Sequence, residues 1–163
     1  KKKIAVGACI LAVLLAAGGL WYTRPQSFWA VTGMDRAAIT GASGIVIESF
    51  YENGTPEQQV WEIDGLAPGQ EGYETLLGLL EGSTYRAHLS NLTAPFSDSQ
   101  PGSERWVQLS FAADGELFSV QIPVSQTMTI PIPDSYGYLR YDASNPQFQG
   151  ELFQYIQANG EKL

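Results

Sequence analysis

The chain has 163 residues with one cysteine and one histidine, and its formal net charge is −8. Four of the nine basic residues precede residue 25, so the remainder carries 17 acidic and 5 basic side chains, a net charge of −12. This balance excludes nucleic-acid binding, and one cysteine with one histidine excludes a disulfide and a zinc site built from these ligands.

The first 22 residues combine three lysines with a long apolar run. Residues 1–3 form a basic flank, and Ile4 to Tyr22 is an uncharged run of 19 residues, about 28 Å long as a helix. That length matches the hydrocarbon core of a bilayer, and the lysines place the N-terminus in the cytoplasm. We therefore predict a single-pass signal-anchor at residues 4–22 in the cell membrane, a linker at 23–27 and one extracytoplasmic domain at 28–163.

Two other export signals overlap the same stretch. Residues 16–18 (AAG) offer small side chains for signal cleavage, which would release a secreted domain. Residues 6–9 (VGAC) resemble a lipobox, but they precede the apolar run instead of following it. We favour the uncleaved anchor because Trp21 and Tyr22 continue the apolar run past the small residues.

The exported domain begins with a predicted hairpin and a helix. Residues 43–51 (SGIVIESFY) and 58–63 (QQVWEI) are strand-like, and Asn53-Gly54 between them is a turn signal. Residues 72–82 place apolar side chains at helical spacing and end at a glycine. The buried stripe of this helix would be Tyr73, Leu76, Leu77 and Leu80.

Further strands follow the helix. Residues 83–90 (STYRAHLS) predict a strand before a long polar loop at residues 91–104. Residues 105–113 and 116–122 alternate with period two, and Asp114-Gly115 between them is a strong hairpin signal.

The C-terminal part adds two strands and a helix. Residues 126–132 and 136–141 continue the alternation across a Pro-Asp-Ser turn. Asn145 suits the N-cap of a helix that Gly160 ends. Its buried face would be Phe148, Leu152, Tyr155 and Ile156.

This order of elements predicts an α+β fold. Consecutive hairpins give a mostly antiparallel sheet of about six to seven strands, and two amphipathic helices cover one face of it. A single N-terminal transmembrane helix precedes this domain.

The sequence offers few groups for catalysis. His88 fits a half-buried strand position, and no serine stands in the Gly-x-Ser-x-Gly elbow that would complete a triad with it. Residues 40–44 (TGASG) begin like a dinucleotide-binding loop, but strand-forming residues follow them directly. The carboxylate pairs Glu71/Glu74 and Asp114/Glu116 fall in a helix first turn and at a hairpin turn. We therefore predict no catalytic, cofactor-binding or metal-ligating residue and no cofactor.

Aromatic residues suggest a contact surface instead. Tyr136 and Tyr138 would share one strand face, and Phe96 stands alone in the polar loop. Such side chains often anchor a protein or glycan partner. We predict a non-enzymatic extracytoplasmic module that binds a protein or envelope ligand. Two alternatives stay open: a carboxylate- or serine-dependent enzyme acting on cell-wall material, and an accessory subunit of another membrane protein.

Overall fold

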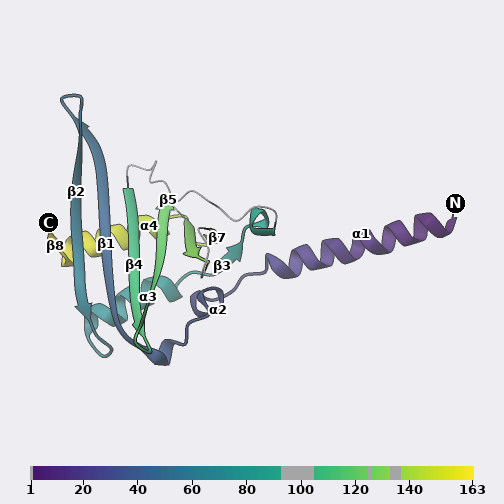
Figure 1. Cartoon of the computed structure of the whole chain (residues 1–163), viewed down its shortest axis with the longest axis horizontal. Coiled ribbons are helices and arrows are strands. Elements are labelled where there is room, and N and C mark those ends of the chain that lie inside the picture. Colours follow the sequence, from purple (N-terminus) through teal and green to yellow (C-terminus); the bar gives the residue numbers. More distant parts are fainter. Residues whose placement is uncertain (1, 93–104, 125, 133–136) are drawn as a thin grey trace.

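One antiparallel sheet organises the domain (Figure 1). The computed structural model describes residues 2–92, 105–124, 126–132 and 137–163. The described residues form eight strands in the order β3-β7-β6-β5-β4-β1-β2-β8. They are β1 (Ile39–Glu52), β2 (Thr55–Leu66), β3 (Tyr85–Ala87), β4 (Arg105–Ala113), β5 (Glu116–Val124), β6 (Thr127–Pro131), β7 (Tyr138–Ala143) and β8 (Glu161–Lys162). The α+β prediction is confirmed, with more strands than we expected.

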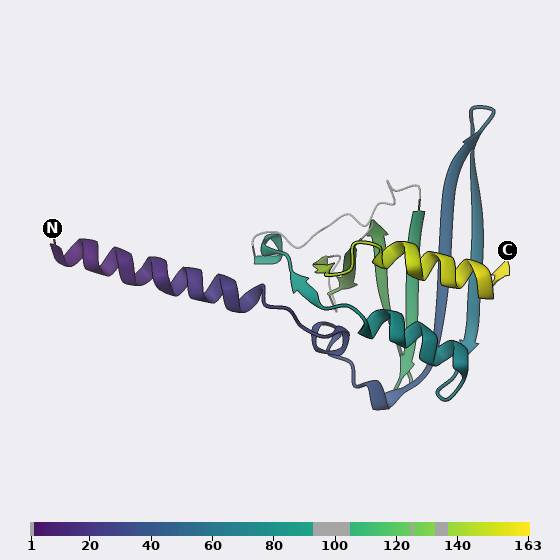
Figure 2. The ribbon, with the colours of Figure 1, turned by 180° about the vertical axis from the view of Figure 1, so that it is seen from behind.

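The described residues also form four α-helices, α1 (Lys2–Tyr22), α2 (Phe28–Thr32), α3 (Glu71–Glu81) and α4 (Phe148–Asn159), and two short 3-10 helices, η1 (Arg36–Ala38) and η2 (Leu89–Leu92). Helices α3 and α4 lie side by side on one face of the sheet, as Figure 2 shows from behind. The two predicted amphipathic helices and their common face are confirmed.

Helix α1 extends away from the sheet (Figures 1 and 2). Its large apolar side chains are mostly exposed, including Leu14, Leu15 and Leu20. Within the described residues, however, no helix combines the length and the apolar character that a membrane crossing requires. The membrane span predicted for residues 4–22 is therefore not found, although a helix is present there.

Residues 23–27, predicted as a linker, already form hydrogen bonds with the domain at Gln26. The backbone N–H of Gln26 donates to the Tyr85 carbonyl at 2.9 Å, and the Tyr85 N–H donates back to Gln26 at 2.8 Å. Ser27 then caps α2, which the sequence did not predict, by accepting from the Ala30 N–H. Phe28 follows with no exposed surface and packs on Tyr85 and Phe111.

The core lies between the helices and one face of the sheet. Along β4, alternate residues are fully buried because successive side chains point to opposite faces. The stripe predicted for α3 meets this face, and each of its four residues is buried. The members of the core shared by β4 and α3 include Val107, Leu109, Phe111, Leu76, Leu77 and Leu80.

The hairpin turns predicted at Asn53-Gly54 and Asp114-Gly115 are present, and the predicted Pro-Asp-Ser turn lies outside the described residues. Asn53 and Gly54 have φ of 52° and 82°, and Asp114 and Gly115 have the same pair of values. Two successive residues with positive φ define a type I′ turn, whose twist matches that of the two strands it joins. Asn-Gly and Asp-Gly are the residue pairs that most readily adopt it.

Several boundaries differ from those expected. The strand predicted at residues 83–90 is shorter in the structure, where β3 is followed by η2, and the side-chain amide of Asn91 in η2 adds a contact with β7. Asn91 Nδ2 donates to the Arg140 carbonyl at 2.8 Å, and Asn91 Oδ1 accepts from the Arg140 N–H at 2.9 Å. Residues 40–44, expected as a loop, belong to β1.

Helix α4 begins at Phe148, three residues after the predicted N-cap. Asn145 instead closes the preceding turn by accepting from the Gln147 N–H at 2.9 Å. The second residue of α4, Gln149, is buried. Its Nε2 donates both hydrogens, one to the Arg105 carbonyl and one to the Ile122 carbonyl, at 2.9 Å each. This amide joins α4 to β4 and β5 at the same point.

Candidate functional site

Of the three residues predicted as partner contacts, the structure describes Tyr138. Tyr138 lies on β7, half-buried, and pairs with Pro131 of β6. Tyr136 and Phe96 lie outside the described residues. Only Tyr138 can therefore be placed, and it lies on the sheet face opposite α3 and α4.

This second face of the sheet is not covered by any described helix, and we call it the open face. Strand alternation assigns its residues: where Val46 and Val107 point to the core, their neighbours Ile45 and Gln108 point to the open face. Directly paired residues continue the pattern across the sheet. One such row runs Glu62, Ile45, Gln108, Gln121, Thr129 and Arg140.

Two β-bulges interrupt the open face close together. On β1, Thr40 is an extra residue between the pairs Ile39–Ala113 and Gly41–Ala112. On β2, Asp64 and Gly65 together oppose Ser43, between the pairs that join Ala42 to Leu66 and Gly44 to Ile63. The second bulge places Gly65 at a φ of 66°, in the left-handed region, which glycine adopts at little cost because it has no Cβ. Bulges re-aim side chains, and they are frequent beside binding and active sites.

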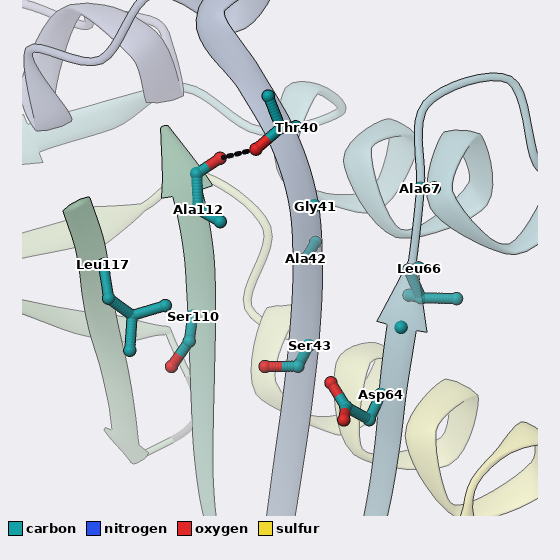
Figure 3. Close-up of a pocket in the computed structure, with 11 residues that line it drawn as sticks. Thr40, Gly41, Ala42, Ser43, Asp64, Leu66, Ala67, Ser110, Ala112 and Leu117 are labelled. Atoms are coloured by element: carbon teal, nitrogen blue, oxygen red, sulfur yellow. Dashed lines mark hydrogen bonds between the residues drawn. The ribbon is translucent and has the colours of Figure 1, made fainter. Parts of the chain in front are cut away.

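The bulges border a hollow of about 230 Å³, which we call the bulge hollow. Figure 3 shows its polar side chains: Thr40 and Ser43 from β1, Ser110 from β4 and Asp64 from β2, with Leu117 of β5 at one side. Leu117 is 72% exposed, so the hollow has one apolar wall that solvent reaches. The arrangement joins three hydroxyls and one carboxylate around a concave surface.

Some of these groups have partners, and others are available to a ligand. Thr40 Oγ1 donates to the Ala112 carbonyl at 3.2 Å, and Ser110 Oγ lies 2.9 Å from Ser119 Oγ. In the described part of the chain, Ser43 Oγ and the Asp64 carboxylate have no hydrogen-bond partner. A hydroxyl can donate and accept, whereas a carboxylate only accepts. The hollow therefore suits a neutral ligand that carries hydroxyl or amide groups.

The charge around the hollow is one-sided. Residues 39–66, which make up β1, its turn and β2, contain five acidic residues and no basic residue. A phosphate or carboxylate ligand would be repelled there. Across the described residues, no group of three or more His, Cys, Asp or Glu side chains is placed to hold a metal ion.

Two polar atoms elsewhere on the open face differ from their neighbours in hydrogen bonding. Trp106 Nε1 and Gln121 Oε1 are buried and have no hydrogen-bond partner among the described residues. Trp106 pairs with Ile47, four residues along β1 from Ser43. An unpaired buried donor or acceptor raises the free energy of the folded state until water or a ligand satisfies it.

The candidate catalytic groups are dispersed. His88 follows β3, and its Nδ1 accepts from the Ser90 N–H at 3.3 Å and lies 2.7 Å from Ser90 Oγ. This is a local turn contact rather than part of the bulge hollow. Glu74 pairs with Arg36 at 3.1 Å on the surface of α3. Asp114 and Glu116 are exposed beside their turn.

Sequence reasoning missed the bulge hollow, although a signal for it was present. Glycines inside strand-like sequence, as in residues 40–44 and at Gly65, often mark bulges. Which hydroxyls then face Asp64 depends on the pairing register of three strands, which no local pattern contains.

A fold alone does not identify a function, so relatives would carry weight here. The chain matches no protein-family model, no curated protein and no solved structure.

Proposed function

We propose that this chain is a non-enzymatic binding module, held at the outer face of a membrane by α1, and that the bulge hollow binds a neutral sugar unit of an envelope glycan. The observation that carries this proposal is the pair of adjoining bulges, which bring Thr40, Ser43, Ser110 and Asp64 around one concave surface.

The chemistry of the hollow supports a sugar. Its available groups, the Ser43 hydroxyl and the Asp64 carboxylate, can receive the hydroxyl hydrogens of a pyranose ring. Leu117 offers an apolar surface to the C–H face of the ring. Specific polar groups set against an apolar wall are typical of small-ligand sites.

The surroundings of the hollow support binding over catalysis. A nucleophilic serine needs an adjacent base, and the described residues that line the hollow include no histidine or lysine. A glycosidase needs two carboxyl groups across the scissile bond, and Asp64 is the one carboxylate in this lining. The enzyme and accessory-subunit alternatives have no comparable observation in their favour.

The N-terminal helix supports attachment to a membrane. Ile10, Leu11, Val13, Leu14, Leu15 and Leu20 are each more than half exposed. A continuous exposed apolar surface of this kind usually marks a contact with lipid or protein.

The glycan proposal is tested with the full chain in detergent micelles. Calorimetric titration with a panel of neutral oligosaccharides, chitotetraose included, should give at least one Kd below about 1 mM. Ser43→Ala should then weaken that binding about tenfold, because one hydrogen bond to the ligand is lost. Ser49→Ala is the matched control, since Ser49 lies on the same strand and the same face but outside the lining.

Two outcomes would overturn the proposal. One is the absence of binding to every neutral oligosaccharide of the panel. The other is an equal loss of affinity in Ser43→Ala and Ser49→Ala, which would place the ligand elsewhere.

The membrane part of the proposal has its own test. Intact-mass measurement of the protein isolated from membranes should show an unprocessed N-terminus. Loss of about 18 residues would favour the secreted alternative, and an added diacylglycerol on Cys9 would favour lipid attachment.

A further inference from the structure

The β1–β2 hairpin continues beyond the rest of the sheet (Figure 1). The last residue of β1 that pairs with β4 is Glu48, opposite Arg105, whereas pairing with β2 continues to Glu52 and Thr55. We call the projecting ribbon of residues 49–58 the arm. In the described part of the chain, no other strand pairs with it. Tyr51 in the arm is 79% exposed.

The two edges of the arm differ in their backbone groups. Glu52 and Thr55 flank a two-residue turn, so they direct their N–H and C=O groups toward each other. By alternation, the backbone N–H and C=O groups of Ser49 and Tyr51 point away from β2. The backbone N and C=O of Pro56 and Gln58 point away from β1 in the same way. The Leu163 N–H donates to the Val60 carbonyl at 3.0 Å, as this alternation requires for the outer edge of β2.

The β1 edge is the better acceptor for another strand. It presents two N–H groups and two C=O groups, at Ser49 and Tyr51. On the β2 edge, Pro56 has no N–H to donate. Proline and short capping segments are common protection for strand edges. β2 carries both, whereas the β1 edge of the arm carries neither among the residues that the structure describes.

Side chains on the arm favour a basic segment on this edge. Glu48, Phe50 and Glu52 share one face of β1, and Glu57 of β2 lies directly opposite Phe50. Glu48 is already paired with Arg105 at 2.9 Å, so Glu52 and Glu57 are the carboxylates that can attract a partner beside Phe50. A second copy of this chain would bring identical carboxylates side by side, which destabilises paired strands. A strand with lysine or arginine at alternate positions would instead be attracted.

We propose that the β1 edge of the arm binds an extended basic segment of a partner protein as an added strand. This surface is separate from the bulge hollow, so the inference goes beyond the glycan proposal and does not depend on it. Main-chain hydrogen bonds supply affinity in this mode of recognition, and alternate side chains supply specificity.

Binding of a fluorescein-labelled Lys-Thr-Lys-Val-Lys-Thr-Lys peptide to the full chain in micelles, followed by anisotropy, tests this proposal. Tyr51→Pro removes an outward N–H without removing a bond to β2, and it should weaken binding at least about tenfold. Gln58→Pro makes the same change on the other edge and should leave the affinity within about twofold. Equal losses in the two variants, or none in Tyr51→Pro, would overturn the proposal.

Two further measurements separate strand addition from general attraction to an acidic arm. Hydrogen exchange in the unmodified protein should slow at the Ser49 and Tyr51 amides when the peptide is bound, and it should not change at Gln58. The double variant Glu52→Gln, Glu57→Gln should weaken binding about threefold or more and reduce its salt dependence. If the peptide binds without protecting the Ser49 and Tyr51 amides, the strand-addition proposal fails.

Discussion

The two faces of the sheet use the same strands in opposite ways. On the helix-covered face, β4 presents Val107, Leu109 and Phe111, which are fully buried. On the open face, the same strand presents Gln108 and Ser110, which are half-buried and polar. The difference arises from strand alternation alone, since neighbouring residues of one strand face opposite sides.

This contrast separates stability from binding. Burial of apolar surface supplies most of the folding free energy, and it is concentrated under α2, α3 and α4. The open face contributes less to stability, so its hydroxyls and bulges can serve a ligand. Four substitutions, taken from the largest expected effect to the smallest, test how the core, the open face and the surface contribute to stability.

The largest effect should come from Phe111, which packs on Phe28 with ring centroids 5.8 Å apart. Phe111→Ala should lower the free energy of unfolding by about 3–5 kcal/mol, because it leaves a cavity in the core. On the open face, Leu117→Ala should change it by no more than about 0.5 kcal/mol. Urea unfolding of both variants in micelles measures the difference. Comparable losses would contradict the division between the faces.

A smaller effect is expected at Gly44, where α4 approaches β1. A Cβ at this position would lie 2.7 Å from Ile156 Cδ1 and 3.1 Å from Leu109 Cδ2. Gly44→Ala should therefore destabilise the protein by about 1–3 kcal/mol through overpacking. Gly41→Ala is the control, because its Cβ would meet the Leu66 carbonyl oxygen at an ordinary 3.6 Å. Thermal unfolding should show a clear shift in Tm for the first variant alone.

Tyr85→Phe should lower the free energy of unfolding by about 1 kcal/mol and change how that free energy depends on pH. Its hydroxyl donates to the Leu80 carbonyl at 2.7 Å, and burial raises the pKa of Tyr85 far above its usual value. Since the unfolded chain ionises first, stability from this group is complete below about pH 10 and is lost as pH rises further.

Tyr85→Phe removes both effects. Unfolding in urea, followed from about pH 8 to about pH 11, should show a shallower alkaline loss of stability in the variant. An identical slope in the two proteins would mean that Tyr85 is not buried in its neutral form.

The smallest effect should come from the surface ion pairs of Arg36. Its guanidinium lies 3.1 Å from Glu74 and 2.8 Å from Glu81, and all three side chains are substantially exposed. Arg36→Gln should cost about 0.5 kcal/mol or less, and about 1 M salt should remove the difference. A loss as large as that of Gly44→Ala would show that η1 contributes more to the fold than its exposure indicates.

Local sequence patterns predicted the elements whose identity depends on residues close together in the chain. The stripe Tyr73, Leu76, Leu77 and Leu80 identified α3, and Asn53-Gly54 and Asp114-Gly115 identified both hairpins. In each case the decisive residues lie within one turn of helix or one tight turn.

Features that depend on distant partners were not predictable. The Asn91 side chain bonds both backbone groups of Arg140, which lies 49 residues later in the chain. The bulge hollow needs Ser43, Asp64 and Ser110 from three strands in a definite register. Sequence periodicity reports which face a residue takes, but it does not report which residue it meets.

The side chain of Gln149 has a consequence for how the sequence can vary. Its amide supplies two hydrogens to carbonyls of β4 and β5, and the residue is 8% exposed. Leucine would remove both of these hydrogen bonds, glutamate has no side-chain hydrogens to donate when ionised, and asparagine is one methylene shorter. The apolar neighbours Leu152 and Ile156 can exchange volume with the core around them. Among chains that share this fold, position 149 should therefore tolerate fewer residue types than the larger apolar positions beside it.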